Sequence, residues 1–174
     1  MKMTIMLADI TTLPVDAIVN AAASDLRPTP GVSGAIHAAA GSELLEACER
    51  SDNCPVGQAV ITSAYGLPSR YVIHAVGPVW QGGHEGEAEL LASAYRAALR
   101  LAHNHRCESV ALPAISTGIS GFPLDAAAEI AIATTHAALE AGGYLEEVVF
   151  ACHTETEVAA YTEAMHQREA TPVG

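Results

Sequence analysis

A stretch of small and polar residues between two apolar segments has the composition of an anion-binding loop. Ser116-Thr117-Gly118-Ile119-Ser120-Gly121 follows the apolar run 110–112 and precedes an alanine-rich helical pattern that begins at Leu124. This order predicts a strand, a loop and a helix, and the free N–H groups and dipole at such a helix start favour an anion. Gly118 and Gly121 would permit positive φ angles and a close approach of the ligand. The stretch therefore predicts a phosphate-binding loop.

Two further polar residues stand directly after apolar runs. Asn20 follows the run 17–19, and His153 follows the run that ends at Cys152. In parallel sheets, ligands bind outside the carboxyl ends of the strands. We therefore expect Asn20, His153 and the loop 116–122 to lie together at one edge of a sheet.

Apolar strands alternate with helical patterns along the chain. Strands are predicted at 3–7, 17–19, 58–63, 71–76, 109–112 and 147–152, and a turn at 9–11. Helices are predicted at 33–50, 87–104, 124–141 and 156–167. Gly41 would break the first helix, and Thr156 is a possible N-cap of the last. Because the strands are apolar throughout, we expect an α/β fold, a three-layer α/β/α sandwich with a mixed, mostly parallel central sheet. One domain is expected over residues 1–174, with a frayed tail at 169–174.

Composition and charge argue against several classes of function. Twenty acidic residues against eight Lys and Arg give a net charge of −12, which opposes general binding to nucleic acid backbones and to anionic membranes. An anionic ligand must therefore be held by local N–H groups. No apolar run approaches the length of a membrane span, and residues 1–7 resemble a strand rather than a signal peptide. Four cysteines without a CxxC spacing are typical of reduced thiols, which predicts a cytoplasmic protein.

Several segments together resemble the macrodomain family, in particular its branch of MacroD-type ADP-ribosyl hydrolases and O-acetyl-ADP-ribose deacetylases. The resemblance extends from about residue 3 to the last helix. It is carried by Asp-Ile-Thr at 9–11, Asp-Ala-Ile-Val-Asn-Ala-Ala at 16–22, Gly-Ala-Ile-His at 34–37, Ala-Ala-Gly at 39–41, Cys-Pro-Val-Gly at 54–57, Tyr-Val-Ile-His-Ala-Val-Gly-Pro at 71–78, and 113–123. The number, order and spacing of these motifs argue against a chance match.

The resemblance implies a fold that binds ADP-ribose as its ligand and uses no cofactor. The Asp9 carboxylate would accept a hydrogen bond from the adenine amino group, with the Ile10 backbone beside it, and His153 would stack on the adenine. The diphosphate and the distal ribose would lie between two walls. The first wall is Ser116, Thr117, Gly118, Ile119, Ser120 and Gly121, with Phe122 against the distal ribose; the second is Gly31, Val32, Ser33 and Gly34.

Two residues depart from the family pattern at the distal ribose. Where the family has an Asn and an Asp, this chain has Ala23 and Ser33, and neither is a general base by itself. In one possible mechanism, a phosphate oxygen of the substrate activates the water, and the protein supplies positioning and electrostatic stabilisation. In the other, Asn20, Ser33 or His37 lies near the water as a substitute. Asp25 is a further carboxylate, but nothing in the sequence places it in the pocket.

Plainer roles compete with these assignments. Ser33 could act only as a helix N-cap, His37 could be a packed structural histidine, and Asn20 could bind a neighbouring loop. His74, which ends an apolar run, is expected to bind backbone groups. No metal site is predicted, because the histidines at 103 and 105 have no third strong ligand at a usual spacing, even with the cysteine at 107 nearby in sequence.

Three functional hypotheses follow. The leading one is a hydrolase that releases ADP-ribose from a protein, from a nucleic acid or from an O-acetyl conjugate. The second is a module that binds ADP-ribose without chemistry, and the third is a regulatory protein that binds another enzyme. The replaced Asn and Asp favour the second hypothesis, whereas the absence of an effector domain in the sequence favours the first.

Overall fold

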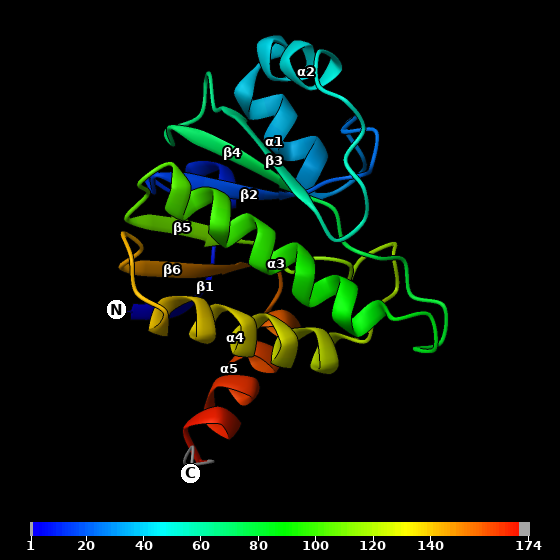
Figure 1. Ribbon diagram of the computed structural model, residues 1–174, viewed down its shortest axis with the longest axis vertical. Helices are drawn as coiled ribbons and strands as arrows, with labels where there is room; N and C mark the ends of the chain where they lie inside the picture. The colour runs from blue at the N-terminus through cyan, green and yellow to red at the C-terminus, as the bar shows by residue number, and fades with distance from the viewer. Residues whose placement is uncertain (1, 171–174) are drawn as a thin grey trace.

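Six strands form one sheet within residues 2–170, the part of the chain that this computed structural model describes (Figure 1). They are β1 (Lys2–Leu7), β2 (Ala17–Ala21), β3 (Ala59–Ser63), β4 (Tyr71–Ala75), β5 (Ser109–Leu112) and β6 (Glu147–Cys152). The order across the sheet is β1-β6-β5-β2-β4-β3. Only the pairing of β3 with β4 is antiparallel among these strands, so the prediction of a mixed, mostly parallel sheet is confirmed.

Helices cover both faces of the sheet. The helical elements are η1 (Ile10–Thr12), α1 (Val32–Ala40), α2 (Ser42–Glu49), α3 (Glu87–Asn104), α4 (Leu124–Glu140) and α5 (Glu155–Ala170). One apolar core lies between the sheet and α3, α4 and α5, and a second lies between the sheet and α1 and α2 (Figure 1). The three-layer α/β/α prediction is therefore confirmed. Gly41, with φ of 91°, separates α1 from α2 at the expected break.

The alternation of side chains along each strand supplies both cores. In β2, Ala17 and Val19 face α3, α4 and α5, whereas Ile18 faces α1 and α2. Ile73 and Val72 divide in the same way in β4. Because both faces of the central strands are buried, β2, β4, β5 and β6 are mainly apolar and show no regular polar alternation.

The last helix differs from its predicted limits. Thr156 is not its N-cap, because α5 begins at Glu155 and the Glu157 N–H donates to Thr154 Oγ1 at 3.1 Å. Glu157 Oε1 in turn accepts from the His153 N–H at 3.3 Å, which completes a reciprocal capping arrangement. At the other end α5 runs to Ala170, so residues 169 and 170 are helical. The rest of the tail that was expected to fray, 171–174, lies outside the described residues.

None of the helices within residues 2–170 is both long enough and apolar enough to span a membrane. The four cysteines are free and buried. The segment at 9–11, predicted as a turn, begins the short 3-10 helix η1 and is capped by Asp9.

Candidate functional site

A cavity of about 770 Å³ opens where β2, β5 and β6 end. The loops that follow these parallel strands meet there, together with the first turns of α1, α4 and α5 (Figure 1). The cavity is lined by residues 21–23, 29–33, 113–114, 116–120, Leu124, Ala151, 153–154 and Glu157. Neither Lys nor Arg is among these lining residues, so an anionic ligand would depend on backbone N–H groups and helix N-termini.

The predicted phosphate-binding loop forms one wall of this cavity. The backbone N–H groups of residues 117–120 have no acceptor within the described part of the chain. The loop is closed by two bonds, from the Phe122 N–H to the Ser116 carbonyl at 2.9 Å and from the Gly121 N–H to the Gly118 carbonyl at 3.0 Å. These unpaired donors at the end of a parallel strand are the feature of the site best suited to a phosphate.

The conformational prediction for the two glycines was half right. Gly121 has a φ of 74°, but Gly118 does not have a positive φ, and the second left-handed residue of the loop is Ser116, at 66°. A Cβ at Gly118 would meet no atom within 4 Å. Gly118 therefore leaves open space beside the unpaired N–H groups rather than enabling the turn.

Two residues from other elements fix the start of this loop. The buried Tyr95 hydroxyl of α3 donates to the Pro113 carbonyl at 3.0 Å and accepts from the Ile115 N–H at 3.1 Å. On the other side, a Cβ at Gly77 would clash with Ser116 Oγ and with the Ile115 side chain, so the chain there must be glycine for the loop to pack as it does. The loop is thus held by packing and by satisfied hydrogen bonds before any ligand binds.

The opposite wall is the start of α1. Its N-cap is Gly31, with φ of 95° and no side-chain cap, so the first N–H groups of the helix remain available. Gly31, Val32 and Ser33 line the cavity, whereas Gly34 does not, since its N–H is bonded to the Thr29 carbonyl at 2.8 Å. The plainer prediction of Ser33 as N-cap was wrong, because Ser33 is the second helical residue and its Oγ accepts from the Thr29 N–H at 3.3 Å.

The end of the cavity at β6 contains His153, as predicted, and also Thr154 and Glu157. Asp9 and Ile10 do not line it. The Thr11 hydroxyl and N–H both donate to Asp9 Oδ1, at 2.7 and 3.0 Å, and lower the pKa of that carboxyl. Asp9 and His153 follow the paired strand ends Leu7 and Cys152, and the Ala8 N–H donates to the Cys152 carbonyl at 3.0 Å, which brings the two segments close together.

Glu157 was missed by the sequence interpretation, although a signal existed. Thr154 and Glu157 have the Ser/Thr-x-x-Glu spacing of a capping box, directly after the last apolar strand. That spacing would have placed both residues at the start of a helix and hence at the carboxyl edge of the sheet.

Asn20 and His37 lie outside the cavity lining, in the core under α1 and α2. Asn20 Nδ2 lies 3.1 Å from His74 Nδ1, and His74 Nε2 lies 3.0 Å from Thr62 Oγ1. His74, expected to bind backbone groups, thus binds side chains instead. The amide nitrogen is a donor, so His74 Nδ1 accepts and Nε2 carries the proton.

Burial keeps both histidines of this core neutral. It lowers the pKa of His74 to about 4, with a smaller contribution from His37, and it lowers the pKa of His37 as well. The His37 ring nitrogens and Asn20 Oδ1 have no hydrogen-bond partner among the described residues. Without a link to the cavity, Asn20 and His37 are poorly placed to act on a water there.

Phe122 was expected against the distal ribose, but it is buried and packs on Trp80, with ring centroids 4.8 Å apart. Phe122 does not line the cavity, whereas Leu124, two residues later, does. Phe122 therefore supports the loop from behind.

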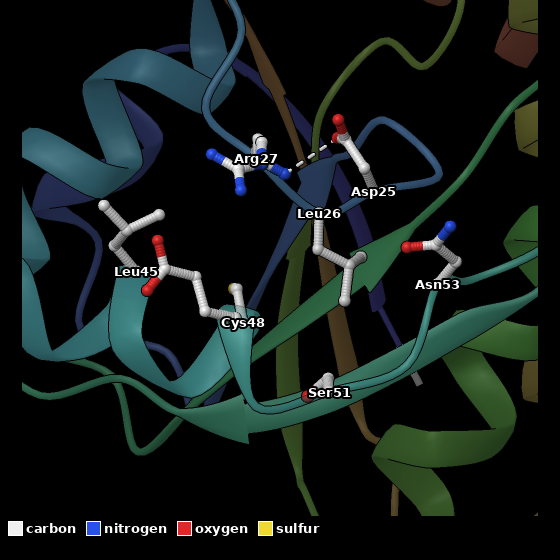
Figure 2. Close-up of a pocket in the computed structure, with 8 residues that line it drawn as sticks. Asp25, Leu26, Arg27, Leu45, Cys48, Ser51 and Asn53 are labelled. Carbon is white, nitrogen blue, oxygen red and sulfur yellow. Dashed lines mark hydrogen bonds between the residues drawn. The ribbon is translucent and has the colours of Figure 1, made fainter.

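A second, smaller cavity of about 410 Å³ lies between the loop after β2 and the end of α2 (Figure 2). Asp25, Arg27 and Glu49 bring charges of both signs to it, and Cys48 contributes a thiol whose pKa is raised by burial. Asp25 belongs to this cavity and not to the larger one. Within residues 2–170, no three His, Cys, Asp or Glu side chains are grouped so as to hold a metal ion.

The three-layer sandwich, with unpaired N–H groups in the loop 116–121 at the carboxyl ends of its strands, defines an α/β/α protein with a candidate site for an anion. More narrowly, the chain belongs to the macrodomain family, since the Macro domain model matches residues 19–131.

Similar proteins agree with this placement. A macro domain-containing protein of Chlorobaculum tepidum is 52% identical over 158 residues, which cover 91% of this chain and 92% of that protein. A protein of Klebsiella pneumoniae named O-acetyl-ADP-ribose deacetylase is 51% identical, over 90% of this chain and 92% of its own. The solved structure of an Oceanobacillus iheyensis macrodomain with ADP superposes with a TM-score of 0.91 at 38% identity, covering 95% of this chain and 90% of that one.

Proposed function

We propose that this chain binds ADP-ribose in the larger cavity and hydrolyses ADP-ribose conjugates. The observation that carries the proposal is the row of unpaired N–H groups at 117–120, which faces a cavity shared with the uncapped start of α1. Unpaired N–H groups on two opposite walls could each bind one phosphate of a diphosphate. The Oceanobacillus iheyensis macrodomain with ADP and the Klebsiella pneumoniae deacetylase support the same ligand class.

The orientation of the ligand follows from the two ends of the cavity. The adenine would lie at the β6 end, where His153 offers a ring and Asp9 lies nearby with an acceptor oxygen. The distal ribose would then lie towards Ala23 and Ser33. Asp9 would accept the hydrogen bond from the adenine amino group there, although it does not line the cavity.

For catalysis we favour activation of water by the substrate. For a conjugate joined through a carboxylate ester, a water between a diphosphate oxygen and the anomeric carbon attacks that carbon and the phosphate oxygen takes its proton. The bond from the carbon to the ester oxygen breaks, and the carboxylate leaves with the electron pair. The protein contributes by fixing the diphosphate against the reacting carbon, which raises the effective concentration and stabilises charge. No protein carboxylate is needed for these steps.

Ser33 is the one proposed substitute base that lines the cavity, and it lacks a partner to take its proton. Its Oγ accepts from the Thr29 N–H, and no hydrogen bond joins it to His37 among the described residues. A serine hydroxyl without a base is a weak nucleophile and a weaker base. Ser33 is therefore better suited to orient the ribose or the water.

A non-catalytic ADP-ribose-binding module is the second candidate function. Ala23 at the cavity, in place of the polar residue that the family pattern has there, favours it. The two candidates are separated by incubating the protein with ADP-ribosylated protein, ADP-ribosylated DNA and O-acetyl-ADP-ribose and following the products by chromatography. A hydrolase converts at least one of the three. Conversion of none, with ADP-ribose still bound in calorimetry, would establish the binding module.

The cellular setting is part of the same proposal. Four free, buried thiols fit a reducing compartment, and a cytoplasmic location is therefore proposed. The physiological ligand would be an ADP-ribosylated protein or nucleic acid recognised through its ADP-ribose, because the charge of −12 opposes general contact with a nucleic acid backbone.

A further inference from the structure

Glu87, the first residue of α3, is a buried carboxylate that binds a loop rather than solvent. It is 2% exposed. Its Oε2 accepts from the Gln81 and Gly83 N–H groups, each at 2.9 Å, and its Oε1 accepts from the Glu85 N–H at 2.6 Å. These backbone donors, that of Gln81 above all, lower the pKa of Glu87 to about 2, so the carboxylate stays charged near neutral pH.

The loop that Glu87 holds, residues 80–86, reaches the phosphate-binding loop through Trp80. The Trp80 N–H donates to the Ser120 carbonyl at 2.8 Å, and its ring packs on Phe122. A Cβ at Gly83 would lie 2.8 Å from Trp80 Cη2, so the loop that Glu87 holds also packs closely against the indole. Trp80 is therefore in contact with both loops.

These contacts form a continuous chain from Glu87 to the unpaired N–H groups. Ser120 lines the cavity and bears one of those groups, and the Phe122 N–H closes the loop on the Ser116 carbonyl. The N–H groups of such a loop bind an anion well only when their directions are fixed beforehand. The support for Ser120 and Phe122 comes from Trp80, and Trp80 depends on the bonds that Glu87 makes.

We propose that Glu87 and Trp80 are positioning residues of the ADP-ribose site. This inference rests on the proposed function for the identity of the ligand. Glu87 touches no part of the cavity, and it acts by fixing the loop 80–86, which holds Trp80 against Ser120 and Phe122. Because coupling between two sites is reciprocal, binding of the diphosphate must also stabilise the loop that Glu87 holds.

The test uses Glu87→Gln, with Glu89→Gln as its matched control. The amide that replaces the Glu87 carboxylate keeps one acceptor oxygen but presents an NH₂ group to backbone donors, which breaks at least one of the three bonds. Glu89 lies in the same first turn of α3, is exposed and pairs with Arg96, so its replacement removes the same charge without touching the loop. Calorimetry with ADP-ribose should show about tenfold weaker binding for Glu87→Gln and a change within about twofold for Glu89→Gln.

The fluorescence of Trp80 gives a second measurement. If Glu87 only stabilised the fold, binding of ADP-ribose would not change this fluorescence. Trp80 is the only tryptophan of the sequence, so its emission reports on the contact between the two loops. Addition of ADP-ribose should change the emission of the wild type. Trp80→Phe removes the signal, and because the smaller ring fills less of the space between Phe122 and Gly83, it should also bind ADP-ribose more weakly than the wild type.

Hydrogen exchange of the wild type keeps the test independent of how well Glu87→Gln folds. ADP-ribose should slow exchange of the Gln81, Gly83 and Glu85 amides, although none of them lines the cavity. The inference is overturned if these amides and the Trp80 emission are unchanged by bound ADP-ribose, or if Glu87→Gln lowers Tm but binds as Glu89→Gln does. If the wild type itself does not bind ADP-ribose, the proposed function fails instead.

Discussion

The hydroxyl of Tyr95 lies 3.0 Å from the Pro113 carbonyl oxygen and 3.1 Å from the Ile115 nitrogen, so one buried side chain of α3 binds both sides of the turn that opens the phosphate-binding loop. Glu87 of the same helix holds the loop behind Trp80. The helix α3 thus fixes the cavity wall at two points, although neither residue is part of the wall.

Tyr95→Phe removes a hydroxyl that is both donor and acceptor. The Ile115 N–H then remains buried without a partner, which we expect to lower the free energy of unfolding by about 1–3 kcal/mol. Urea denaturation measures this change. Tyr71→Phe is the control, because the Tyr71 hydroxyl makes no hydrogen bond within the described residues, and it should change stability by less than about 0.5 kcal/mol. Equal effects of the two variants would contradict the role of the Tyr95 hydroxyl.

Gly118→Glu should abolish ADP-ribose binding without unfolding the protein. A side chain at this position enters open space and needs no positive φ, so the fold tolerates it, but a carboxylate beside the N–H groups at 117–120 repels a diphosphate. Gly118→Ala is the matched control and should keep its Tm and most of its affinity. Calorimetry with ADP-ribose decides the matter, and undiminished binding by Gly118→Glu would remove the loop from the site.

Ser33→Ala should lower the rate of conjugate hydrolysis by less than about tenfold. The reason is that a phosphate oxygen of the substrate, and not the hydroxyl, accepts the proton of the attacking water. Single-turnover rates with saturating protein separate this effect from any change in affinity. A loss of about 10²–10⁴-fold is typical of removing a general acid or base and would show that Ser33 takes part in the proton transfer.

Acid should destabilise the fold through His74. Folding lowers the pKa of His74 from 6.5 to about 4. Between pH 6.5 and pH 4, His74 is therefore protonated in the unfolded chain but largely neutral in the folded one. The stability associated with neutral His74 is therefore present above pH 6.5 and is lost as the pH falls towards 4, by about 3 kcal/mol.

Urea titrations of wild type and His74→Gln between pH 7 and pH 4 test this expectation. The stability difference between the two should shrink by about that amount towards pH 4. A constant difference between wild type and His74→Gln over this pH range would mean that His74 is not held neutral by the fold.

The sequence predicted the architecture because apolar runs and small-residue loops are local signals. Short continuous apolar runs such as 110–112 favour strands buried on both faces, and their alternation with helical patterns favours a parallel sheet. The position of the loop 116–121 between a strand and a helix was predicted for the same reason, since it follows from the order of the segments along the chain.

The side-chain direction at Asn20 was predictable but was overlooked. Asn20 stands two residues after Ile18, and a strand has a period of two, so both side chains face α1 and α2. The backbone at the carboxyl end of a strand lies near the cavity. The side chain there points towards the cavity only if the alternation of side chains along the strand puts it on the right face of the sheet.

The role of Glu87 could not be predicted from the sequence. An acidic residue in the first turn of a helix is usually explained by the helix dipole. Its partners are backbone N–H groups of a loop whose path depends on Gly82 and Gly83, with φ of 95° and 89°. No side-chain pattern records such contacts, and the same is true of the Trp80 bond to the Ser120 carbonyl.

Titration of the wild-type protein with ADP-ribose in a calorimeter is the sharpest test of what the larger cavity binds. We expect saturable binding of one molecule per chain, weaker binding of AMP, which lacks the second phosphate and the distal ribose, and competition by ADP. Absence of binding heat with ADP-ribose over a range of temperatures, or equal affinity for AMP, would contradict the assignment of the larger cavity to the diphosphate and distal ribose.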